Sequence, residues 1–90
     1  MLAVWIKRHL EEVGEDYPYS MYLALKSRYG NKVSYDTLRV YIYRLKKAGF
    51  VELSRTERAE RQSIFERHYY RITDRGRRAG DEEWVEAVRG

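Results

Sequence analysis

The sequence has 90 residues, of which 43% are hydrophobic and 36% are charged, and it has no cysteine. We therefore expect one domain that lacks both disulfides and thiolate metal ligands. Apolar runs of only a few residues exclude a membrane span or a signal peptide and predict an intracellular, cytoplasmic protein, while the many Trp, Tyr, Leu, Ile and Val residues exclude a disordered tail.

Positive charge is concentrated in the middle of the chain. The net charge is +4, yet residues 26–78 hold 15 Lys and Arg against 6 Asp and Glu, whereas the remaining residues hold 3 against 8. One basic stretch on a polarised molecule is typical of a protein that binds a polyanion. A surface that is simply rich in charge explains the same numbers equally well.

Three helices are predicted in the first half of the chain. Apolar residues recur at helical spacing over residues 2–13, and Gly14 stands where a helix C-cap falls. Ser20 is the expected N-cap of a second helix that Gly30 ends, after a connector that contains Pro18. Ser34 is the expected N-cap of a third helix that ends at Gly49.

The periodicity changes after Gly49. Residues 50–54 and 68–73 are rich in β-branched and aromatic side chains and predict two strands, with a charged hairpin between them. Thr73 or Asp74 is suited to cap a last helix over about residues 74–89, with a kink or break near Gly80. The prediction is a single α+β domain over residues 1–90 of the winged helix-turn-helix type: a three-helix core, a two-stranded β-hairpin wing at about 50–73 and a C-terminal helix.

The helix-turn-helix, at about residues 20–48, carries the candidate chemistry. Only a helix or a two-stranded ribbon fits the major groove of DNA, where base edges present distinguishable donors and acceptors. The first turns of the third helix normally meet base edges, and its later basic residues suit phosphate. The candidate DNA contacts are Ser34, Tyr35, Thr37, Arg39, Tyr43, Arg44 and Lys46 on the helix, with Arg55, Arg58 and Arg61 on the wing.

The residue pattern resembles a known family. Residues 33–51, with Arg44-Leu45 before Gly49, are similar to the recognition helix and first wing strand of PadR-like and MarR-like transcription regulators. Tyr70-Arg71-Ile72-Thr73 followed by Gly76 is similar to their second wing strand and next helix. The resemblance covers roughly residues 19 to 80. Small single-domain members of this kind occur in archaea and their viruses, which the Tyr- and Arg-rich composition suits.

The resemblance implies sequence-specific binding of double-stranded DNA by a homodimer. It places the recognition helix in the major groove, the wing on the flanking backbone or minor groove, and the dimer contact on the terminal helices. For Trp5 and Trp84, the two tryptophans on these terminal helices, a role in the hydrophobic core is an equal alternative. Asp36 departs from the pattern, because its charge repels phosphate unless it caps the helix or accepts from a cytosine amine. The candidate dimer residues are Leu2, Trp5, Trp84 and Val88.

Two other functions are alternatives to DNA binding. An enzyme is disfavoured because the two histidines, His9 and His68, lie on different elements, and no phosphate loop or nucleophile elbow is present. No cofactor and no metal are expected. The second alternative is a winged-helix module for protein or RNA contacts, since nine tyrosines suit an adhesive surface.

Overall fold

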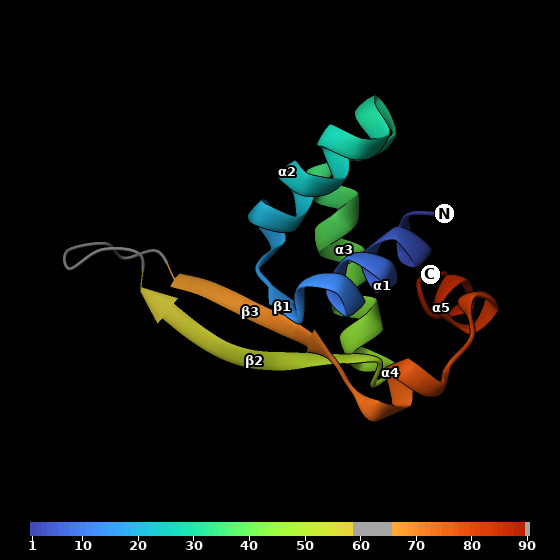
Figure 1. The fold of residues 1–90 in the computed structure, drawn as a ribbon. Coiled ribbons are helices and arrows are strands. Elements are labelled where there is room, and N and C mark those ends of the chain that lie inside the picture. Colours follow the sequence, from blue (N-terminus) through green and yellow to red (C-terminus); the bar gives the residue numbers. More distant parts are fainter. Residues whose placement is uncertain (59–65, 90) are drawn as a thin grey trace.

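A computed structural model of the protein describes residues 1–58 and 66–89. Three helices, α1 (Leu2–Val13), α2 (Pro18–Tyr29) and α3 (Tyr35–Lys47), precede a long hairpin of β2 (Val51–Arg58) and β3 (Glu66–Ile72). A short strand β1 (Glu15–Asp16), a 3-10 turn η1 (Gly30–Lys32) and two short helices, α4 (Asp74–Arg78) and α5 (Asp81–Ala87), complete the order (Figure 1). The predicted α+β winged helix is confirmed.

The start of α2 differs from the prediction. Tyr17, not Ser20, is the N-cap residue, and Pro18 occupies the first turn. Proline suits this place because its fixed φ is helical and its missing N–H would have had no partner inside the helix. The helix therefore begins earlier than the Ser20 signal indicates.

The sheet has a third strand that the sequence did not predict. The order is β1-β3-β2, and Glu15 and Asp16 pair with Arg71 and Tyr70 of β3. Two residues are too few to show a strand period, which explains the miss. Because β1 follows α1 directly, it joins the base of the wing to the helical core.

The hairpin contains an irregularity at Ser54. Leu53 pairs with Tyr70 and Arg55 pairs with Tyr69, so one extra residue lies between consecutive pairs. An extra residue of this kind bends the strand and changes the direction of its side chains. The hairpin extends from the body of the molecule in Figure 1.

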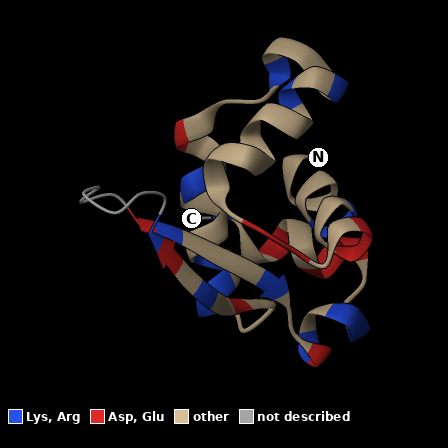
Figure 2. Cartoon of the chain, turned by 60° about the vertical axis from the view of Figure 1, so that its left-hand side comes forward, with Lys and Arg blue, Asp and Glu red and all other residues tan. Residues whose placement is uncertain are grey.

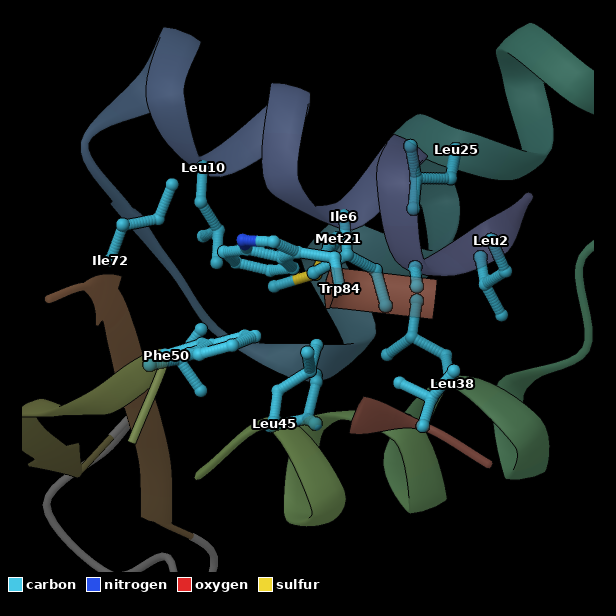
Figure 3. Packing of buried hydrophobic residues seen from close by; sticks show 14 of the residues in the cluster. Leu2, Ile6, Leu10, Met21, Leu25, Leu38, Leu45, Phe50, Ile72 and Trp84 are labelled. Atoms are coloured by element: carbon cyan, nitrogen blue, oxygen red, sulfur yellow. The ribbon is translucent and has the colours of Figure 1, made fainter. Parts of the chain in front are cut away.

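Three of the four residues predicted for the dimer surface are buried in the core of the single chain. Trp84 has no exposed area and packs among α1, α2 and α3, with Phe50 at a ring distance of 5.5 Å (Figure 3). Leu2 and Val88 are only 8% and 5% exposed in the single chain. These three side chains stabilise the monomer and have almost no surface left for a second copy. Trp5 is half-buried and stacks on Tyr29 with ring centroids 3.8 Å apart.

The C-terminal helical region breaks near Gly80, as predicted. Thr73 caps α4 by accepting from the Gly76 N–H at 3.0 Å, and α5 begins after Gly80. Gly76 lies against the backbone of Phe50, and its carbonyl accepts from the Trp84 indole N–H at 3.0 Å. This contact fixes α4 and α5 against the end of α3. No helix in the described ranges is long and apolar enough to cross a bilayer.

Candidate nucleic-acid interface

Helix α3 has an inner and an outer side. Leu38, Ile42 and Leu45 are buried in the core. At its start, the Ser34 hydroxyl accepts from the Thr37 N–H at 3.4 Å, so the predicted N-cap is confirmed. Helix α2 packs beside α3, and the turn η1 joins them. A capped helix held on its apolar side presents its other side in a fixed orientation.

The exposed side of α3 combines four different chemical groups. Asp36, Arg39, Val40 and Tyr43 line one open depression, and we call these four residues the α3 outer face. Val40 is 44% exposed and Tyr43 is 61% exposed. Their spacing of three or four residues brings them onto one side of the helix. The face offers a carboxylate, a guanidinium, a branched apolar chain and a phenol.

Three tyrosines support the beginning of this face. Tyr19 and Tyr22 of α2 pack against Tyr35 with ring centroids 5.7 and 5.4 Å away. The Arg39 guanidinium carbon lies 5.7 Å from the centroid of the Tyr35 ring. A guanidinium held over an aromatic ring has less conformational freedom to lose on binding. Tyr35 therefore serves in the free protein as a support for Arg39.

The last turns of α3 carry more positive charge than its first turns. Lys46 is exposed, and the Lys47 ammonium lies 5.4 Å from the centroid of the Tyr43 ring. Arg44, by contrast, turns away from the outer face and donates from Nη1 to the Val88 carbonyl at 2.7 Å. Arg44 thereby satisfies an acceptor at the end of α5 and ties that helix to α3.

A network of charges occupies the base of the wing. The Glu15 carboxylate accepts from Ser54 Oγ at 3.0 Å and from Arg55 Nε at 2.7 Å. Neighbours in a regular strand point to opposite faces, so the irregularity at Ser54 explains how both reach one carboxylate. Arg55 also donates to Glu57 at 2.7 Å. The hydrogen bonds that Arg55 donates to Glu57 and Glu15 raise the pKa of Arg55, and the bond from Arg55 lowers the pKa of Glu57.

Aromatic rings extend this network toward α2. The Arg55 guanidinium carbon lies 3.8 Å from the centroid of the Tyr69 ring, and Tyr69 meets Tyr17 edge to face at 5.2 Å. Arg67 lies over the other ring of the pair, 5.0 Å from the Tyr17 centroid. The wing is therefore attached to the chain that enters α2, and its direction relative to α2 and α3 is set by these contacts.

The predicted site residues separate into groups. Ser34, Thr37, Arg39, Tyr43 and Lys46 are exposed on α3, and Tyr35 is half-buried beside them. Arg44 and Arg55 both make intramolecular bonds, whereas the Arg58 side chain is 66% exposed and, among the described residues, has a long 3.9 Å contact to Glu66. Arg61 lies outside the described residues. Figure 2 shows the basic residues of the hairpin alternating with acidic ones.

Two members of the outer face were missed from the sequence as candidate contacts. Val40 was not among the predicted contacts, and Asp36 was left with two alternatives, capping the helix or accepting from a cytosine amine. The spacing of Asp36, Arg39, Val40 and Tyr43 was the available signal, since these positions recur at helical period opposite the buried residues.

A helix-turn-helix followed by a two-stranded wing, with exposed polar and basic residues on its second helix, defines a winged-helix DNA-binding domain. The chain matches the transcriptional regulator PadR-like family over residues 6–82 and belongs to that family. It is accordingly a DNA-binding transcription regulator. No curated protein and no solved structure gives a match.

Proposed function

We propose that the protein binds double-stranded DNA sequence-specifically, with α3 in the major groove and the β2–β3 hairpin over the flanking backbone or minor groove. The single observation that carries this proposal is the α3 outer face, where exposed polar and apolar groups stand opposite a buried side. A helix in the major groove can bring such groups to base edges. A regulator of this kind would act in the cytoplasm.

The proposed contacts have different tasks. Arg39 is assigned to a guanine, because a guanidinium pairs bidentately with guanine O6 and N7 and because Tyr35 already orients it. Arg44 and Arg55 are assigned to holding α5 and the wing in place through their bonds to Val88 and Glu15. The remaining proposed contacts are Ser34, Tyr35, Thr37, Tyr43 and Lys46 on α3, with Arg58 and Arg61 on the wing.

We also propose that the protein binds as a homodimer through the terminal helices. Helices α1 and α5 pack against each other, so one surface can use both. Trp5 and Val85 on these helices keep part of their area exposed. Two copies related by a two-fold axis would bind half-sites about 10 bp apart or a multiple of it. Sedimentation at micromolar concentration tests this, and a monomer, free and DNA-bound, would refute it.

Selection of bound sites from a random duplex pool tests the DNA proposal. The expected result is an enriched, near-palindromic sequence. Arg39→Ala should then weaken binding to that site by about 1–3 kcal/mol and relax one base position. Arg77→Ala is the matched control, because Arg77 is an exposed arginine on α4 that pairs with Asp74 at 3.0 Å. Equal losses for the two variants, on selected and random DNA alike, would show that Arg39 contacts no base.

A further inference from the structure

The α3 outer face has a composition that phosphate binding does not explain. A surface that only follows the DNA backbone needs cations and hydrogen-bond donors. This face instead places a carboxylate, Asp36, and an exposed apolar chain, Val40, in the same depression as Arg39. Phosphate repels the carboxylate and gives the valine nothing to pack against. The face is therefore suited to base edges.

No hydrogen bond or ion pair within the described residues accounts for Asp36. The N-cap of α3 is Ser34, whose hydroxyl already bonds the Thr37 N–H. Among the described residues, the Asp36 carboxylate has no hydrogen-bond donor and no ion-pair partner. Its place in the first turn lets the helix dipole favour its negative charge. The carboxylate is thus exposed and available to accept a hydrogen bond.

Major-groove chemistry selects the base that Asp36 fits. The groove presents amino donors only on cytosine N4 and adenine N6. Adenine N6 lies between two acceptors, its own N7 and thymine O4, which both repel a carboxylate, whereas cytosine N4 has an acceptor, guanine O6, on one side only. Cytosine is therefore the favoured partner.

The other residues of the face complete the specificity. Arg39 lies one turn after Asp36, so its guanidinium can reach guanine O6 and N7 of the same or the next base pair. Val40 and Tyr43 offer apolar surface beside it, and the apolar group that the major groove presents is the thymine methyl. Each of the three chemistries in the depression has one matching base feature.

We propose that the α3 outer face recognises a half-site with a cytosine amine at Asp36, a guanine edge at Arg39 and a neighbouring thymine methyl at Val40 and Tyr43. This inference rests on the proposed DNA binding and adds the identity of the bases. It makes Asp36 and Val40 specificity-determining residues. Each of them should respond to a different change in the DNA: Asp36 to exchange of the cytosine, and Val40 to loss of the thymine methyl.

The test uses the full chain and the duplex selected by the wild-type protein. The selected half-site is expected to contain adjacent C·G and T·A pairs. Changing the thymine to uracil removes only the methyl and should weaken wild-type binding about fourfold. Val40→Ala should discriminate less between the two duplexes than wild type does. Exchange of the cytosine should weaken wild-type binding by about 5- to 150-fold and should have little effect on Asp36→Ala, which has no side-chain acceptor.

Binding to random duplex DNA provides an independent readout for Asp36. Because Asp36→Ala removes a charge that repels phosphate, this variant should bind random DNA at least as tightly as wild type while losing the preference for cytosine. If Asp36 only stabilised the start of α3, its replacement would lower the melting temperature and leave the base preference intact, which would overturn the inference.

The failures of the two proposals are distinguishable. A wild-type protein that binds no duplex at roughly 50 mM salt would overturn the proposed function and this inference together. A protein that binds duplex DNA and selects a site, but treats uracil as thymine and tolerates every base at the cytosine position, would overturn the inference alone.

Discussion

Gly76 is the position where a single added methyl group should do the most damage. An alanine Cβ there would overlap the carbonyl oxygen of Phe50 and lie 3.0 Å from both the Phe50 carbonyl carbon and Ile72 Cγ2. The Phe50 carbonyl cannot rotate away freely, because it accepts the Thr73 N–H at 3.0 Å. Gly76→Ala must therefore separate α4 from the end of α3.

The expected cost follows from three contributions. Overpacking against backbone belongs at the upper end of its range, about 3 kcal/mol, and the weakened Thr73–Phe50 hydrogen bond adds about 1 kcal/mol. The better helix propensity of alanine returns about 1 kcal/mol. The free energy of unfolding should fall by about 3 kcal/mol, and the melting temperature by about 12–24 °C for a domain of this size.

Gly80→Ala is the matched control. Gly80 has a φ of −77° and ψ of 171°, and a Cβ there meets nothing within 4 Å. The gain from a less flexible unfolded chain and the loss of a glycine N-cap nearly cancel, so the change should stay within about 1 kcal/mol. Denaturation followed by circular dichroism measures both variants. Gly76→Ala within about 0.5 kcal/mol of Gly80→Ala would refute the close approach of α4.

Three other substitutions test the same packing and capping. Trp84→Phe removes the indole N–H that donates to Gly76, and urea denaturation should show a loss of about 2–3 kcal/mol; a loss below about 1 kcal/mol would contradict that bond. The Lys7 hydrogen bond lowers the pKa of Asp81 from its ordinary value of 3.8, so the stability it adds is lost as pH falls below that value. Asp81→Asn should be less stable than wild type at neutral pH and equal to it in acid. The same difference in melting temperature between the two proteins at every pH would contradict this. Ser34→Ala removes the cap of α3 and should cost about 1 kcal/mol by thermal melting, with no effect if the cap is unused.

The elements that follow a clear period could be predicted from the sequence. The apolar spacing of α1 and α3, the cap at Ser34 and the change of period after Gly49 each give a local signal. The break near Gly80 and the cap at Thr73 are also local. These signals were sufficient for the order of the three main helices and the two wing strands, and for the winged helix, but not for β1.

What the sequence could not supply depends on contacts between distant residues. Glu15 lies in a strand of two residues whose partner is 56 positions away, at Arg71. Arg44 has the period of a helix surface, yet its bond goes to Val88 at the other end of the chain. Trp84 lies in a weakly helical stretch, and only the packing of α5 against α1 and α3 decides that it is buried. Helical periodicity predicts on which side of a helix a residue lies, but it does not predict which distant residue packs against that side.

The central claim is that the α3 outer face and the wing bind duplex DNA with sequence preference. The most direct measurement is the affinity of the protein for its selected duplex and for a random duplex as salt is raised from roughly 50 to 200 mM. Both log affinities should fall linearly with log salt, with a slope of about −0.9 per phosphate neutralised. The selected duplex should bind at least about 10³-fold more tightly, and Arg39→Ala should reduce that ratio. No binding to any duplex at the lowest salt, or equal affinity for both, would contradict the claim.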